Sequence, residues 1–252
     1  MSDAKHWCVS FDGVTKGRVK NVTIASSHGG LIATNVVKID AERCHFKQNT
    51  TAGVQTCSTD GDTSVIEVKH CHSSRNGTVG YIAHKGGTIL MVECTSDDDE
   101  FGALVSDSGV LRATGAVFRK SMIGARAMNG GTLNLIDCAA RKFRSYAVFV
   151  SGQGTKLNVR GGCFVESQLH GIGVANGAQA RLKDLNVSRS MSCGVIVSDK
   201  GSTMELDGCK LEEDAQDGGV ALDDGQMIVN LTSSVGNNRS GGFVGKAVNK
   251  II

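Results

Sequence analysis

The stretch GTLNLIDCAARKFRSYAVFVSGQG, residues 131–154, contains the unit from which most of this chain is built. It begins at a glycine, passes through the alternating segment Leu133 to Leu135 and through Cys138, and reaches a second apolar run at residues 147–150. Short alternating apolar runs separated by turn residues indicate strands rather than helices. Three such runs in one unit predict one triangular coil of a solenoid.

The same unit recurs at a nearly constant period. Glycines mark its start at Gly87, Gly109, Gly131, Gly154, Gly177, Gly201 and Gly225, with spacings of 22, 22, 23, 23, 24 and 24 residues. One continuous repeat in a chain of 252 residues predicts a single elongated domain rather than two globular ones.

The core positions of each unit follow a spacing of two and then three. The sets are Ile66, Val68, Cys71; Ile89, Met91, Cys94; Leu111, Ala113, Ala116; Leu133, Leu135, Cys138; and Met204, Leu206, Cys209. A spacing of two is that of a strand with one face inward, and the step of three indicates a bend.

The last position of each set predicts an internal column along the solenoid. Its members are Cys44, Cys71, Cys94, Ala116, Cys138, Cys163, Leu185 and Cys209. Because alanine and leucine replace cysteine in it, we interpret the column as core packing rather than as a metal site.

A second column consists of glycines at the start of the third strand. Its members are Gly53, Gly80, Gly102, Gly124, Gly171, Gly194, Gly219 and Gly242, with Ala147 as the exception. A glycine repeated at one corner predicts either a positive φ or a close approach of two backbones.

This pattern resembles the right-handed parallel β-helix proteins of the pectin-lyase-like superfamily. The resemblance covers about residues 36–245 and rests on the 22–24-residue period, the three short strands per coil, the glycine-rich corners and the inward aliphatic and cysteine ladders. It implies an all-β, right-handed parallel β-helix of about nine to ten coils. We expect residues 1–35 to form an N-terminal cap with a first irregular coil, and residues 246–252 to close the other end.

Composition restricts the compartment and the partners. A net charge of +2 is too small by itself to indicate nucleic acid or an anionic membrane. Residues 1–11 lack the apolar segment of a signal peptide, and no apolar run is long enough to span a membrane. The nine cysteines, interpreted as free thiols, favour the cytoplasm or another reducing compartment, with incorporation into a particle left open.

Two acidic stretches are catalytic candidates, because superfamily members that cleave polysaccharides use carboxylates on an outer face. They contain Asp97 and Asp98, and Glu212 and Glu213. One corner column reads Lys47, Ser74, Asp97, Arg119, Arg141, Glu166, Ser188 and Glu212. Its mixture of charges also fits a solvated ladder of opposite charges. The nearly constant coil length leaves no long loops to wall a cleft, and this disfavours catalysis.

Two histidines are candidates for metal binding. His45 and His72 each follow a cysteine of the internal column and are expected to point outward from adjacent coils. With His70 and Glu93 nearby they could chelate a metal, and the alternative is that they are ordinary surface histidines. The nucleophile-elbow, P-loop and metalloprotease motifs are absent, and no cofactor is predicted.

The outward residues of the third strand form a candidate binding surface. The large apolar ones are Ile82, Leu104, Phe149, Ile196 and Val244, and positions such as Arg126 and Ala221 interrupt them. An outward face is polar unless something covers it, so this apolar stripe predicts an interface with a second copy or another protein. The alternative is that a terminal segment folds over it.

A basic patch on two adjacent coils is a second candidate surface. It contains Arg119, Lys120, Arg141, Lys142 and Arg144. It could hold an anionic polysaccharide, whereas the few aromatic residues nearby disfavour single-stranded nucleic acid.

We therefore expect a non-catalytic β-helix that serves as a structural or interaction module. It would self-associate or join a larger assembly, such as a viral or cell-surface particle. The alternative is a carbohydrate-active enzyme, either a polysaccharide lyase or a glycoside hydrolase, or a glycan-binding protein of the same superfamily.

Overall fold

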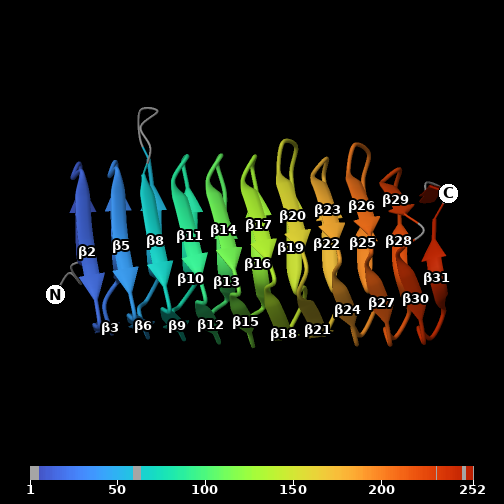
Figure 1. The fold of residues 1–252 in the computed structure, drawn as a ribbon, viewed down its shortest axis with the longest axis horizontal. Helices are drawn as coiled ribbons and strands as arrows, with labels where there is room; N and C mark the ends of the chain where they lie inside the picture. Colours follow the sequence, from blue (N-terminus) through green and yellow to red (C-terminus); the bar gives the residue numbers. More distant parts are fainter. Residues whose placement is uncertain (1–5, 59–63, 231, 246–247, 252) are drawn as a thin grey trace.

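The computed structural model describes residues 6–58, 64–230, 232–245 and 248–251, which form one elongated right-handed β-helix (Figure 1). The described strands β1–β32 lie in three parallel sheets of eleven, eleven and ten strands. None of the described residues forms a helix, so this part of the chain has no helix that could span a membrane. The predicted fold class is confirmed.

Sheet A contains the third strand of the predicted unit. Its strands in spatial order are β1 (Trp7–Asp12), β4 (Gly29–Thr34), β7 (Ala52–Cys57), β10 (Val79–His84), β13 (Phe101–Val105), β16 (Ile123–Met128), β19 (Val148–Ser151), β22 (Ile172–Ala175), β25 (Val195–Val197), β28 (Asp217–Ala221) and β31 (Gly241–Val244).

Sheet B contains the first strand of the unit. Its strands are β2 (Lys16–Lys20), β5 (Lys38–Glu42), β8 (Val65–Lys69), β11 (Thr88–Val92), β14 (Val110–Thr114), β17 (Thr132–Ile136), β20 (Lys156–Arg160), β23 (Gln179–Lys183), β26 (Thr203–Asp207), β29 (Gln226–Asn230) and β32 (Val248–Ile251).

Sheet C contains the short second strand. Its strands are β3 (Thr23–Ala25), β6 (His45–Lys47), β9 (His72–Ser74), β12 (Thr95–Asp97), β15 (Val117–Arg119), β18 (Ala139–Phe143), β21 (Cys163–Ser167), β24 (Asn186–Ser188), β27 (Lys210–Glu212) and β30 (Ser234–Gly236).

The predicted end segments contain residues outside the described ranges. Within the N-terminal segment, β1, β2 and β3 already pair in register with β4, β5 and β6. Within the C-terminal segment, β32 pairs with β29 and so adds a strand to sheet B. The coil period is also less constant than the glycines indicate, because Cys44 and Cys71 occupy adjacent coils 27 residues apart.

The core is the predicted set of inward positions. Ile66, Val68, Ile89 and Leu111 are completely buried, and Met91 is almost so. Cys44, Cys94 and Cys209 are buried with free thiols, which confirms packing as the environment of most of the cysteine column. Burial raises the pKa of Cys44 and Cys209, so these thiols are poor nucleophiles.

The prediction for Cys163 is wrong. Cys163 is exposed and pairs with Ala139 in sheet C, one position beyond the internal column. Gly162, with φ of 99°, takes the inward position after Val159. The same shift places Val165 rather than Glu166 beside Arg141 in the charged column.

The second glycine column is required by close packing rather than by a positive φ. A Cβ on Gly80 would lie 2.6 Å from the Gly102 carbonyl oxygen, and one on Gly102 would lie 2.4 Å from that of Gly124. Side chains are excluded because these corners stack backbone directly on backbone. At the tenth coil Gly218 holds this position instead of the predicted Gly219, because it is the neighbour of Gly194.

Left-handed residues make the bends between sheets. The corner after sheet C has one in nearly every coil: Gln48, Arg75, Asp98, Lys120, Lys142, Glu166, Arg189, Glu213 and Asn237, with φ between 52° and 63°. None of these residues is glycine, so each carries backbone strain that the stacked coils maintain.

We expect Gln48→Gly to raise stability by about 1 kcal/mol, because Gln48 is exposed and glycine adopts a φ of 55° without strain. Gln48→Val should lower it, since a β-branched residue is the least tolerant of this conformation. Urea unfolding of the two variants measures the difference. Equal stability of both would contradict a left-handed corner at this position.

Candidate functional site

The first acidic stretch separates into residues with different environments. Asp97 points outward from β12 and lies 3.2 Å from Arg119 Nε and 3.6 Å from Lys120 Nζ. Asp98 is the left-handed corner residue. Asp99 is buried inside the solenoid, where its carboxylate accepts hydrogen bonds from Ser96 Oγ at 2.7 Å and the Asn76 amide nitrogen at 2.7 Å. Asp97 and Asp98 therefore belong to an outer charge ladder rather than to a catalytic pair.

Asp99 ends an internal polar ladder that runs through four coils, formed by Ser27, Asn49, Asn76 and Asp99. Ser27 Oγ donates to Asn49 Oδ1 at 2.7 Å, Asn49 Nδ2 to Asn76 Oδ1 at 2.9 Å, and Asn76 Nδ2 to Asp99 Oδ1 at 3.1 Å. Burial raises the pKa of Asp99. The ladder supplies hydrogen-bond partners that buried polar groups require.

The second acidic stretch has a similar division. Glu212 ends β27 and Glu213 is the left-handed corner residue, whereas Asp214 is only 2 % exposed. Asp214 Oδ1 accepts a hydrogen bond from the Ser190 amide at 2.8 Å, but its buried Oδ2 has no partner among the described residues. Burial raises the pKa of Asp214 to about 6. The strands β12 and β27 are five steps apart in sheet C, about 24 Å at ~4.8 Å per step, so the two stretches do not meet.

The histidines form pairs rather than a cluster. His45 and His72 are neighbours in sheet C with ring centroids 5.7 Å apart. His70 lies 3.2 Å from Glu93 through Nδ1. Burial lowers the pKa of His72, and His45 adds to this effect. No group of three or more potential metal ligands occurs among the described residues.

The basic patch is only partly neutralised. Arg119 and Arg141 are neighbours in register, and Asp97 pairs with Arg119 and Lys120. Arg141, Lys142 and Arg144 are exposed and have no ion-pair partner in the described part of the chain. Beside the patch, a shallow pocket is lined by His72, Ser74, Arg75, Asp97, Asp98 and Lys120, which we call the sheet C pocket.

The residues of the predicted apolar stripe are aligned on neighbouring strands of sheet A, but several of them are less exposed than expected. Ile82, Leu104, Arg126, Phe149, Gly173 and Ile196 occupy consecutive strands of sheet A, and Val220, not Ala221, continues the row. Ile82, Leu104 and Phe149 are half-buried in an outer apolar cluster with Trp7, Ala52, Val79, Phe101, Met122, Ile123 and Tyr146. Ile196 lies outside this cluster, and so does Val244, which is 48 % exposed.

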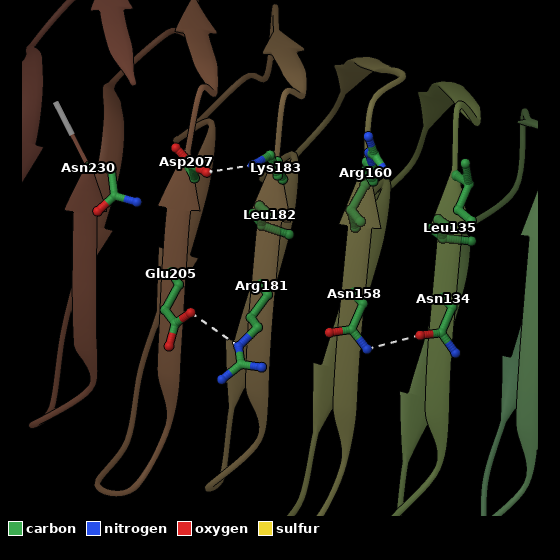
Figure 2. Close-up of a pocket in the computed structure, with 12 residues that line it drawn as sticks. Asn134, Leu135, Asn158, Arg160, Arg181, Leu182, Lys183, Glu205, Asp207 and Asn230 are labelled. Atoms are coloured by element: carbon green, nitrogen blue, oxygen red, sulfur yellow. Dashed lines mark hydrogen bonds and ion pairs between the residues drawn. The ribbon is translucent and has the colours of Figure 1, made fainter. Parts of the chain in front are cut away.

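A shallow groove on the outer face of sheet B was not predicted from the sequence. Figure 2 shows two rows of side chains that cross its strands: Asn134, Asn158, Arg181 and Glu205 in one, and Arg160, Lys183 and Asp207 in the other. We call this the sheet B groove. The signal was present in the outward residues between core positions, such as Asn134 between Leu133 and Leu135.

Contacts within the groove link neighbouring coils. Asn158 Nδ2 donates to Asn134 Oδ1 at 2.9 Å, and Arg181 pairs with Glu205 at 3.1 Å. Lys183 lies 3.1 Å from Asp207 and, as its hydrogen-bond partner, lowers the pKa of that carboxyl. Arg160 has no ion-pair partner among the described residues. Ile136, which is 43 % exposed, adds an apolar surface to the lining.

The comparisons with known proteins show the family. The protein-family model described as "right handed beta helix region" matches residues 3–164, and the chain therefore belongs to that family. No curated protein matches the chain significantly.

Solved structures with the same fold include three proteins linked to polysaccharides or phage. The A-module of the mannuronan C-5 epimerase AlgE6 from Azotobacter vinelandii has a TM-score of 0.63 at 9% identity, covering 98% of this chain and 90% of its own. Pectate lyase Pel9A has a TM-score of 0.52 at 10% identity, and the match covers 90% of this chain and 69% of the lyase chain. The enzymatically active domain of bacteriophage CBA120 tailspike protein 2 has a TM-score of 0.52 at 12% identity, and the match covers 94% of this chain and 43% of the tailspike chain. At these identities the similarity shows the fold.

We expect the stability of the protein to rise as pH falls from 7 through 6 toward 4. Asp214 has a higher pKa folded than unfolded, so its ionised form destabilises the folded state, by up to about 3 kcal/mol. Asp214→Asn should be more stable than the wild type at pH 7, and the difference should shrink toward pH 4. Urea unfolding across this range measures it. A variant less stable than the wild type at pH 7 would show that the charge is needed.

Proposed function

We propose that this chain binds a polysaccharide in the sheet B groove, with the sugar chain along the solenoid axis. The observation that carries the proposal is the pair of polar rows in Figure 2, which places a hydrogen-bonding or charged side chain on each successive strand from β17 to β26. Strands in the sheet are ~4.8 Å apart. This spacing is close to the length of one sugar residue in an extended chain, so each coil can meet one residue.

The chemistry of the groove suits sugar hydroxyl and carboxylate groups. The Asn158–Asn134 hydrogen bond leaves Asn134 Nδ2 as a donor and Asn158 Oδ1 as an acceptor for a ligand. Ile136 offers an apolar surface to the C–H face of a sugar ring. Arg160 is available for a carboxylate, since guanidinium groups bind carboxylates with two parallel hydrogen bonds. The ion pairs Arg181–Glu205 and Lys183–Asp207 are exposed and contribute little to stability, so a ligand can replace them.

The similar structures support an acidic polysaccharide. Two are named for action on uronate polymers, a mannuronan epimerase and a pectate lyase, and the tailspike domain is named as enzymatically active. Their similarity in fold supports polysaccharide binding over the predicted role as a structural or interaction module.

A panel of alginate, polygalacturonate and a neutral glucan tests the proposal by affinity electrophoresis. The double variant Asn158→Ala with Arg160→Ala should weaken binding of an acidic polymer by about tenfold, because it removes an amide and the unpaired cation. Arg18→Ala is the matched control, since Arg18 is exposed on the same sheet in β2, outside the groove. The proposal fails if no polymer binds, or if the groove variant and the control bind equally.

A second candidate function is proton abstraction from a uronate residue at the sheet C pocket. Burial lowers the pKa of His72, which favours the neutral imidazole that a base requires. Lys120 lines the same pocket, and Arg119 lies beside Asp97, so cations are placed near a substrate carboxylate. Such an arrangement fits removal of the C5 proton next to that carboxylate. In elimination the C4–O bond then breaks as a C4–C5 double bond forms, and in epimerisation a proton returns to C5 from the opposite face.

Incubation of polygalacturonate and alginate with the protein in D₂O tests this second function. Exchange or elimination at carbon 5 should be seen by NMR, with a pH profile that inflects below the usual histidine pKa of about 6.5. His72→Gln should abolish it, whereas His45→Gln should shift the inflection upward, since His45 contributes to the lowering. Absence of turnover, or full turnover by His72→Gln, would exclude His72 as the base.

A further inference from the structure

Arg126 stands alone as a charge in the middle of the outer apolar cluster on sheet A. Leu104 precedes it and Phe149 follows it in the same outward row. Its guanidinium carbon lies 5.5 Å from the centroid of the Phe101 ring and 5.9 Å from that of the Phe149 ring. Two aromatic faces thus hold the cation in one place.

No acidic side chain in the described part of the chain pairs with Arg126. Its Nε is buried and has no hydrogen-bond partner there, so the group has lost water without gaining an acceptor. By contrast, Arg181 and Lys183 on sheet B each have an acidic partner on the next coil. The half-buried side chain reaches solvent through its terminal nitrogens, which are the atoms a ligand could contact.

The surroundings of Arg126 are apolar and ordered by packing. Phe101, which is 8 % exposed, faces the guanidinium, and Ile123, which is 5 % exposed, belongs to the same cluster. The Tyr146 ring lies 4.8 Å from that of Phe149, and both occupy the space that a side chain on Gly173 would need. The result is a firm surface of rings and aliphatic groups around one unpaired cation.

We propose that this surface binds an apolar peptide segment through a carboxylate that pairs with the Arg126 guanidinium. The Arg126 guanidinium has a buried Nε and no anionic partner among the described residues, and a carboxylate matches its planar fork. The aliphatic surface around it favours a peptide over a sugar chain, because sugar hydroxyls placed on Leu104, Ile82 and Phe149 would lose water without finding hydrogen-bond partners. Charge complementarity at the centre of an apolar patch is typical of binding hot spots rich in arginine and aromatic residues. This site is on a different face from the sheet B groove and does not depend on the proposed polysaccharide binding.

Two short aliphatic peptides that differ only in a central glutamate or glutamine test the proposal. NMR titration of the full chain, following the Arg126 Nε–H signal, should show saturable binding of the glutamate peptide, about tenfold tighter than the glutamine peptide. Arg126→Met keeps the apolar surface, and in this variant the preference for glutamate should disappear. Arg112→Met is the matched control, because Arg112 is an exposed outward arginine on β14 of sheet B, and it should leave the preference unchanged.

Several results would overturn the proposal. They are equal binding of the two peptides, absence of binding by both, and a preference for glutamate that persists in Arg126→Met. Displacement of the peptide by oligogalacturonate would assign the site to acidic sugars and also overturn it. Circular dichroism of both variants confirms that they are folded before the titration.

Discussion

The hydrogen bonds between successive coils are the interaction on which the rest of the structure depends. Along sheet C, for example, the Val117 amide donates to the Cys94 carbonyl at 2.9 Å, and the Ala139 amide donates to the Ala116 carbonyl at 2.9 Å. These bonds are parallel and in register, so each residue lies above its counterpart in the previous coil. Equivalent positions of successive coils therefore form a column that has the same environment along the molecule. The side chains in each column must be able to pack against similar side chains in the neighbouring coils.

This constraint explains how the solenoid combines a packed interior with three chemically different faces. Inside, the columns are aliphatic or aromatic, or contain thiols and amides that hydrogen-bond to an adjacent coil. Outside, the faces are independent, because a change of residue on one sheet does not alter the register of the others. Sheet B carries polar rows, sheet C carries the histidine pair and the basic patch, and sheet A carries the outer apolar cluster. One backbone can thus support separate surfaces for different ligands.

The sequence was sufficient for the fold because the inward positions repeat at spacings of two and three, as Ile89, Met91 and Cys94 show. It was insufficient where residue type and position disagree. Cys163 is the residue type expected in the internal column, but Gly162 occupies the inward position. A glycine with φ of 99° fits there. The acidic stretches looked like clusters, although Asp98 and Asp99 are separated by a left-handed bend that sends one outward and the other inward. The sheet B groove depends on the combination of side chains from several coils, which no single unit displays.

The internal polar ladder also has a direction, and this limits how the chain can change in length. Each asparagine amide donates toward the C-terminal coil, from Asn49 to Asn76 and from Asn76 to Asp99. An ionised aspartate accepts but cannot donate, so the run stops at Asp99. A duplicated coil bearing another asparagine could be inserted ahead of Asp99 and continue the pattern, whereas a duplicate of the Asp99 coil would stack two buried carboxylates. Evolution can therefore add or remove asparagine coils on the N-terminal side of Asp99, whereas duplication of the Asp99 coil itself is unfavourable.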